Sequence, residues 1–157
     1  MPPFEIPRGD DGAVLPHDHP DLTGENRVIR RISDEYVVPD GAGGQRISSG
    51  VFKHDPLQGH LSLDSEKCIL ATEADPVRYV TSPVWVGALV ISVEGFRAVN
   101  QPKKPEETWK IGMLPVDGNP CHAGAWGKII QGQSNELQRR SDWLVQIPGV
   151  TKQMPQT

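Results

Sequence analysis

The densest group of ligand-binding side chains follows the glycine pair Gly43-Gly44. Arg46, Ser48 and Ser49 stand within one four-residue segment there. A guanidinium offers a forked donor for phosphate or carboxylate, hydroxyls can bond a sugar, and glycines let backbone approach a ligand closely. The same residues also suit an ordinary edge strand with its polar groups in water. We predict Arg46, Ser48 and Ser49 as candidate ligand-binding residues and keep the edge-strand interpretation as the alternative.

A second candidate is the lone histidine of residues 119–123. A tight turn there would deliver His122 at the start of a strand, where side chains often line a cleft. His122 is then either a ligand-contacting residue or general base, or a structural residue bonded to the turn. Its neighbour Cys121 would point to the opposite face of the strand, so the two do not form a nucleophile and its base.

Two other histidine segments carry weaker signals. His17 and His19, with Asp18 between them, have metal-binding donors and resemble the His-x-His pattern of cupins. Prolines flank them, whereas cupin histidines stand on a barrel strand, so we interpret them as solvated arm residues and predict no metal site. His60 and Ser62 match the His-x-Ser/Thr-apolar element that two-histidine phosphoesterases use in pairs. The chain has no second copy, so we interpret this match as chance.

Short strands must position these side chains, because 16 Gly and 15 Pro leave little room for long helices. The run 84–93 is the most apolar, and we predict it as the centre of the sheet. The fold class predicted is α+β, with a twisted, mainly antiparallel sheet of five to seven strands and two short-to-medium helices. We predict strands at 27–32, 45–53, 84–93, 96–99, 109–114 and 122–130, and helices at 65–74, capped by Asp64, and 135–146, capped by Ser134.

Composition changes along the chain indicate three parts. Residues 1–26 hold several prolines and aspartates and few large apolar side chains, so we predict an extended acidic N-terminal arm. Residues 27–150 are predicted to form a single α+β domain, and residues 151–157 a C-terminal tail.

Charge and cysteine content indicate the class of partner and the compartment. The chain has 16 Lys+Arg and 20 Asp+Glu, a formal charge of −4, so no overall field attracts a nucleic-acid backbone. Cys68 and Cys121 stand beside apolar or small residues, as buried thiols do, which favours a reducing compartment and a cytoplasmic location. Neither a signal-peptide pattern nor a long apolar run is present, so we expect no export by that route and no membrane span.

Part of the chain resembles a known family. Residues 31–32, 43–46 and 61–64, with the predicted helix ending near Glu73, resemble RES-type toxins, which are similar to ADP-ribosyltransferases and consume NAD. This resemblance implies that Arg31, Arg46 and Ser62 line a cofactor pocket and that Glu73 acts as the acid.

A second resemblance covers the middle of the chain. Residues 30–32 (Arg-Arg-Ile), 48–52 (Ser-Ser-x-x-Phe) and 119–123 (Asn-Pro-x-His-Ala) are similar to elements of uncharacterised small bacterial proteins. This resemblance implies a bacterial origin and transfers no mechanism.

Two functional hypotheses follow. In the first, the loop before Arg46 and the turn before His122 converge on a cleft for a small anionic, nucleotide-like ligand, with NAD as the candidate cofactor and ADP-ribosyl transfer or glycosidic cleavage as the chemistry. In the second, the chain is a non-catalytic module that binds another protein through its arm and Trp109, Trp126 or Trp143. An enzyme would gather Arg46, His122 and a carboxylate around one pocket.

Overall fold

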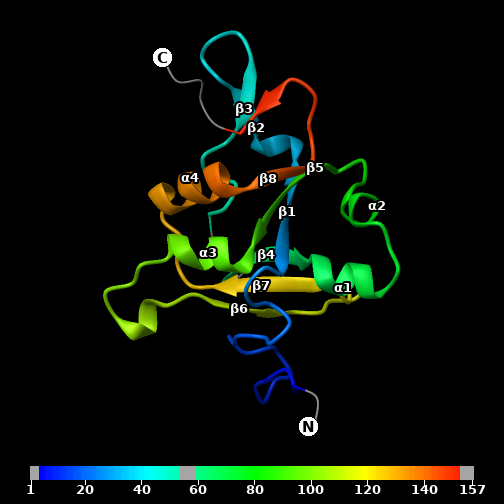
Figure 1. The fold of residues 1–157 in the computed structure, drawn as a ribbon, viewed down its shortest axis with the longest axis vertical. Coiled ribbons are helices and arrows are strands. Elements are labelled where there is room, and N and C mark those ends of the chain that lie inside the picture. The colour runs from blue at the N-terminus through cyan, green and yellow to red at the C-terminus, as the bar shows by residue number, and fades with distance from the viewer. Residues whose placement is uncertain (1–3, 54–58, 153–157) are drawn as a thin grey trace.

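The computed structural model describes residues 4–53 and 59–152 and shows an α+β fold (Figure 1). The main sheet has six antiparallel strands in the order β6-β7-β4-β1-β5-β8, and a smaller sheet has the order β2-β3-β9. The predicted α+β class and strand number are therefore confirmed. Within the described ranges no helix is long and apolar enough to span a bilayer. The elements are β1 Arg27–Ser33, η1 Asp34–Tyr36, β2 Val37–Pro39, β3 Gln45–Ile47, β4 His60–Ser65, α1 Glu66–Ala71, α2 Pro76–Val80, β5 Trp85–Ser92, α3 Val93–Val99, η2 Pro105–Glu107, β6 Lys110–Met113, β7 His122–Trp126, α4 Gln131–Arg140, β8 Asp142–Val145 and β9 Val150–Thr151.

Strand β4 shows how the main sheet separates two kinds of surface. Leu61 and Leu63 belong to the larger apolar core, whereas His60, Ser62 and Asp64 alternate with them and lie on the opposite face. We call these two surfaces the apolar face and the polar face. The cleft described below takes its polar lining from the polar face and also reaches Leu61 and Leu63.

Helices α3 and α4 cover the apolar face, and Figure 1 shows them on the other side of the sheet from α1 and α2. Phe96 of α3 and Leu137 of α4 are fully buried there. The rings of Phe52 and Trp109 pack edge-to-face on Phe96, with centroids 6.4 and 5.4 Å away. Each such side chain contributes about 1.5–3 kcal/mol by leaving water, so this face supplies most of the hydrophobic stabilisation.

The polar face has a smaller apolar cluster under α1 and α2. Ile69 of α1 and Val80 of α2 pack with Ile29 of β1 and Val90 of β5. The residues that β4 and β7 contribute to this face, such as His60 and His122, are not part of the cluster. The helices therefore cover only part of the polar face.

A disulfide joins Cys68 and Cys121 beside this smaller cluster. The backbone N–H of Ser65 donates to the carbonyl of Cys121 over 2.9 Å, and the two cysteine Cα atoms lie 5.4 Å apart. The prediction of two buried thiols is therefore wrong. The cysteines stand 53 residues apart in the sequence, and only the pairing of β4 with β7 brings α1 beside the turn before His122.

The N-terminal arm packs along the outer edge of β6. The N–H of His19 donates to the carbonyl of Ile111 over 3.0 Å, and the carboxylate of Asp18 accepts from the N–H of Ile111 over 3.1 Å. Asp18 also pairs with Arg97 of α3, and Leu22 is fully buried in the larger core. These contacts satisfy backbone groups that an uncovered edge strand would leave open.

His17 is 7% exposed, so the interpretation of this residue as solvated is wrong. Its ring occupies the space above Gly112, where a Cβ atom would come within 2.5 Å of His17 Nε2. His17 Nδ1 lies 2.8 Å from the carbonyl of Leu15, while the buried Nε2 atom has no hydrogen-bond partner in the described structure. A glycine on β6 therefore makes room for the arm.

Segment 93–99 forms helix α3, where the sequence predicted a turn into a strand at 96–99. Ser92 Oγ accepts a hydrogen bond from the N–H of Gly95 over 3.0 Å and caps the helix. Glu94 stands in the first turn, where it complements the helix dipole. The serine cap that favours a helix was visible in the sequence, and it outweighs the short apolar run 96–99 that favoured a strand.

The predicted helix 65–74 is the shorter helix α1 at 66–71, and a second helix that was not predicted, α2, follows at 76–80. Ser65, not Asp64, caps α1, since its Oγ accepts from the N–H of Cys68 over 3.1 Å. Directly after the predicted end at residue 74, the carboxylate of Asp75 accepts from the N–H of Val77 over 3.2 Å and caps α2. Proline at the first helical position suits a helix start as well as a stop.

Four further boundaries differ from prediction. Helix α4 covers 131–140, and residues 142–145 of the predicted helix 135–146 form β8 because they pair with β5. Ser134 lies inside α4 and bonds the N–H of Phe52 instead of capping the helix. Strands β3 and β7 end at Ile47 and Trp126 rather than at 53 and 130. The predicted central run 84–93 is β5, an interior strand next to the edge strand β8.

The C-terminal boundary predicted at 150 falls inside strand β9. This strand runs parallel to β3, with Val150 opposite Gln45 and Thr151 opposite Arg46. Residues 153–157 of the predicted tail lie outside the described residues.

Candidate functional site: a cationic cleft on the polar face

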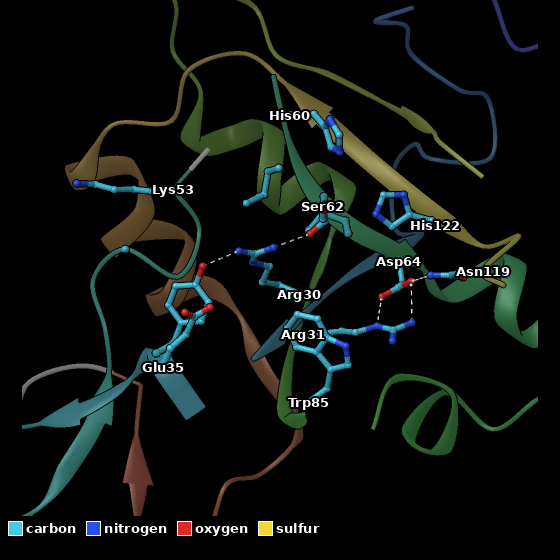
Figure 2. Close-up of a pocket in the computed structure, with 14 residues that line it drawn as sticks. Arg30, Arg31, Glu35, Lys53, His60, Ser62, Asp64, Trp85, Asn119 and His122 are labelled. Carbon is cyan, nitrogen blue, oxygen red and sulfur yellow. Dashed lines mark hydrogen bonds and ion pairs between the residues drawn. The ribbon is translucent and has the colours of Figure 1, made fainter. Parts of the chain in front are cut away.

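A cleft of about 570 Å³ has walls from β1, η1, β4, the start of β5 and the start of β7 (Figure 2). Leu61 and Leu63 of the apolar face line it together with residues of the polar face. Its side chains include Arg30, Arg31, His60, Ser62 and His122. The volume lies within the range of pockets that hold one small organic ligand.

Strand pairing explains why these residues meet. Asp64 of β4 lies directly opposite His122 of β7, and Ile29 of β1 lies opposite Asp64 on the other side. By the two-residue period, His60, Ser62 and Asp64 share this face with Arg31 and His122. Three strands that are distant in sequence thus contribute adjacent side chains.

Arg31 and Asp64 form a bidentate ion pair at one end of the cleft. Arg31 Nε and Nη2 donate to the two oxygens of Asp64 over 2.7 and 3.2 Å. Asn119 Nδ2 donates to Asp64 Oδ1 over 2.7 Å, and the hydroxyl of Tyr79 donates to Asn119 Oδ1. The carboxylate of Asp64 is only 2% exposed, so this network neutralises and fully engages it.

Arg30 carries a positive charge that no carboxylate compensates directly. Its guanidinium donates to the carbonyls of Val51 and Ser62 over 2.8 and 3.0 Å, and lies 3.5 Å from the hydroxyl of Tyr36. These acceptors are neutral, and no described carboxylate lies within ion-pair distance. Burial lowers the pKa of Arg30, against the opposing effect of Tyr36 and more distant acids. A guanidinium nevertheless stays charged near neutral pH, so the cleft holds a cation prepared for an anion.

Two histidines stand near Ser62 (Figure 2). The ring centroids of His60 and His122 are 6.1 Å apart and nearly perpendicular. His122 Nδ1 lies 2.8 Å from the carbonyl of Leu114, and a carbonyl can only accept, so this nitrogen carries the hydrogen. In the neutral form of His122 the lone pair therefore lies at Nε2.

The rim of the cleft mixes aromatic and charged residues. Trp85 and Tyr36 are half-buried and offer ring surfaces. Lys53 also lines the cleft, but its side chain points away from the histidines and its ammonium lies 3.4 Å from Gln131 Oε1. Glu35 is exposed and accepts from Ser33 Oγ over 3.3 Å.

Three of the residues selected from the sequence lie in the cleft, namely Arg31, Ser62 and His122. His122 Nδ1 lies against the carbonyl of Leu114, and the residue also lines the cleft, so both interpretations of His122 stay predictions. The two other selected groups, which are Arg46 with its serines and Glu73, are not among the lining residues.

Arg46 and the two serines serve local structure. Arg46 Nη1 donates to the carbonyl of Ile47 over 3.1 Å, and its buried Nε atom has no partner in the described structure. Ser48 Oγ accepts from the N–H of Gly50 over 3.2 Å in the turn that ends β3, and Ser49 Oγ accepts from Gln131 over 3.3 Å. Arg46 therefore does not line the cleft together with His122, as the first hypothesis expected.

Glu73 is exposed in the turn that follows α1. Its backbone φ of 63° makes it the non-glycine residue with positive φ in the described chain. Glu73 is not among the residues that line the cleft with His122.

Sequence reasoning missed Arg30 and Asp64 as cleft residues. The Arg-Arg pair of β1 was visible, but alternation predicts opposite faces for Arg30 and Arg31, and both guanidinium groups reach the cleft. Asp64 was interpreted as a helix cap, although its polar alternation with Leu61 and Leu63 was the available signal. The His60–Ser62 match was interpreted as chance because the chain has no second copy of the motif.

The tryptophans and the arm histidines provide no comparable site. Trp109 is 1% exposed and donates from Nε1 to the carbonyl of Lys128, whereas Trp126 and Trp143 are half-buried. Among the described residues no cluster of His, Cys, Asp and Glu has the size needed to hold a metal ion.

Comparisons of the chain with protein-family models, with curated proteins and with solved structures gave no match. The geometry of the cleft is thus the basis for the function proposed below.

Proposed function

We propose that the cleft binds a small anionic, nucleotide-like ligand, with a phosphate at Arg30. The uncompensated guanidinium of Arg30 is the observation that carries this proposal. Three neutral acceptors hold it in place, and among the described residues two of its five N–H donors remain for a ligand. A desolvated cation without a carboxylate is costly, and an incoming anion removes that cost.

The aromatic rim supports a ring-bearing ligand. Trp85 and Tyr36 flank the cleft, and a base or similar ring stacks on such surfaces for about 1–3 kcal/mol. Ser62 adds a hydroxyl near the histidines. One phosphate and one heteroaromatic ring are the parts of a mononucleotide.

NAD-consuming chemistry has less support than binding. Arg31 and Ser62, two residues that the RES-type resemblance implies, line the cleft, whereas Arg46 and Glu73 stand outside it. NAD therefore belongs among the ligands to be tested, and ADP-ribosyl transfer stays a prediction from the resemblance. The cytoplasmic location also stays a prediction, and the disulfide removes the support that unpaired thiols gave it, since such bonds persist mainly in oxidising compartments.

Calorimetry and thermal unfolding with AMP, ADP, NAD, inorganic phosphate and uncharged adenosine test the proposal. A ligand at one hundred times its dissociation constant adds about 2.7 kcal/mol to stability. We expect AMP or ADP to bind more tightly than adenosine, and Arg30→Gln to lose that preference. Arg139→Gln is the matched control, because Arg139 is an exposed arginine of α4.

Should Arg30→Gln not fold, Trp85→Ala gives an independent reading, with weaker binding of AMP expected and that of inorganic phosphate retained. A folded wild-type protein that binds none of the phosphate-bearing ligands would contradict the proposal. That result would favour the alternative of a non-catalytic protein-binding module, for which the half-exposed Trp126 and Trp143 would be the first positions to examine.

A further inference from the structure

We infer that His60 and His122 are a general acid–base pair that cleaves a phosphodiester of mononucleotide size in this cleft. The inference rests on the proposed anion-binding function and adds a reaction to it. Its basis is the placement of two imidazoles, 6.1 Å apart between ring centroids, in the cleft that Arg30 also lines. That spacing suits two groups that flank one phosphoryl group.

His122 is suited to be the base. Its Nδ1–H is held by the carbonyl of Leu114 over 2.8 Å, which fixes both the tautomer and the ring orientation. The disulfide at the neighbouring Cys121 and the pairing with Asp64 on β4 hold the backbone of this residue. The Nε2 lone pair is then available to a substrate in the cleft.

His60 is suited to be the acid. It begins β4 directly opposite Trp126 of β7, and its ring centroid lies 6.2 Å from that of the indole. Two residues on, Ser62 shares the same face. The two histidines therefore approach the cavity from neighbouring strands rather than from one flexible loop.

Charged groups from the elements around the cleft set the electrostatic environment of His60 and His122. Arg30 and Arg31 come from β1, Asp64 from β4, and Lys53 and Glu35 from the rim. Asp64 is occupied by Arg31 and Asn119, so it does not cancel the charge of Arg30. Arg30 can stabilise the negative charge that develops on the phosphoryl oxygens.

The reaction needs water as its only co-reactant. Neutral His122 takes a proton from water at Nε2, and the water oxygen forms a bond to phosphorus. The bond from phosphorus to the leaving ester oxygen breaks, and that oxygen receives a proton from the imidazolium of His60. The products are a phosphate monoester and an alcohol, and solvent exchange returns one proton to His60 and removes one from His122.

A small substrate fits better than a polynucleotide. The cleft of about 570 Å³ holds roughly one nucleotide. The chain carries a formal charge of −4, so it offers no general attraction for a long phosphate backbone.

The test combines turnover with binding in the full chain. Bis(4-nitrophenyl) phosphate and nucleoside 2′,3′- and 3′,5′-cyclic phosphates are the substrates, and calorimetry with AMP measures binding of a product-like monoester. We expect His60→Ala and His122→Ala each to lower kcat about 10²–10⁴-fold with little change in KM. His19→Ala, an arm histidine outside the cleft lining, should retain activity.

The pH profile separates the two roles. Wild-type kcat/KM should be bell-shaped, His122→Ala should lose the acidic limb, and His60→Ala should lose the basic limb. Binding of AMP without turnover of any diester would overturn the acid–base role and leave the binding function standing. Turnover unaffected by both histidine variants would overturn it equally, and absence of both binding and turnover would overturn the two proposals together.

Discussion

The two faces of the main sheet use the same strands for different purposes. On the apolar face, the leucines of β4 are buried in one large cluster with Phe96 of α3 and Leu137 of α4. On the polar face, α1 and α2 cover only a small cluster, and arginines and histidines beside that cluster line the cleft. Stability is thus concentrated on one face and candidate chemistry on the other.

The difference lies in what holds each face together. The apolar face relies on non-directional burial, which tolerates many side chains of suitable volume. The polar face relies on specific links, including the Arg31–Asp64 pair and the disulfide between Cys68 and Cys121. Directional links keep polar side chains in one geometry, as a binding site requires.

The largest expected effect comes from breaking the ion pair of the polar face. Arg31→Met leaves the nearly buried carboxylate of Asp64 without its cation, and we expect the free energy of unfolding to fall by about 3–5 kcal/mol. The double variant Arg31→Met/Asp64→Leu should recover most of that loss, because it converts the site into apolar surface.

Denaturant unfolding measures both effects, and Arg27→Met is the control. Arg27 also stands on β1 and pairs with Glu66, but its side chain is 42% exposed, so a loss within about 1 kcal/mol is expected. Equal losses for Arg27→Met and Arg31→Met would show that the polar face has no special dependence on its pair.

The disulfide should have the next largest effect. Replacing both Cys68 and Cys121 by serine removes a cross-link between residues 53 positions apart in the sequence. The chain-entropy relation for a loop of that size predicts that the free energy of unfolding falls by about 4 kcal/mol. Wild-type protein unfolded under reducing conditions should show the same reduced stability as the double variant. Titration of two reactive thiols in the native, unreduced protein would contradict the assignment.

A smaller effect is expected where the arm meets the polar face. A methyl group at Gly112 would lie 2.5 Å from His17 Nε2 and 2.6 Å from the His17 carbonyl, so Gly112→Ala should displace the arm at a cost of about 1–3 kcal/mol. Hydrogen exchange at the N–H of His19, which bonds Ile111, should become faster. Gly124→Ala is the control, since its new atom meets Leu114 and His60 only at 3.4 and 3.5 Å.

The smallest effect concerns the pH dependence of arm docking. Burial alone would raise the pKa of Asp18, but hydrogen bonds from Arg97 and Ile111 and the charges of Arg97 and Lys110 together lower it below its usual value. Asp18 therefore stabilises the folded state above the pKa it has when unfolded, about 4, and this contribution disappears as pH falls through the lower folded pKa. Because its side chain is 45% exposed, we expect less than about 1 kcal/mol.

Unfolding curves of wild type and Asp18→Asn between pH 7 and 2 measure this contribution. The stability difference should be present at neutral pH and vanish in acid. A constant difference across that range would show that the charge of Asp18 does not hold the arm against β6.

Several elements follow directly from local sequence. The β-branched segments that became β1, β5 and β6 were found with boundaries within a residue or two, because a two-residue period and flanking turn formers are local signals. The start of β7 at His122 followed from the preceding turn in the same way. Segment 142–145 was assigned to a helix instead, because its strand form depends on pairing with β5.

By itself, then, the sequence determined the α+β class, most interior strands and the candidacy of Arg31, Ser62 and His122 as site residues. Only the tertiary structure decided which side chains meet. It brought Arg30, His60 and His122 together, paired Cys68 with Cys121 and left Arg46 outside the cleft. The physical reason is that strand order and register are set by long-range packing of the two faces, and no local pattern of residues encodes that packing.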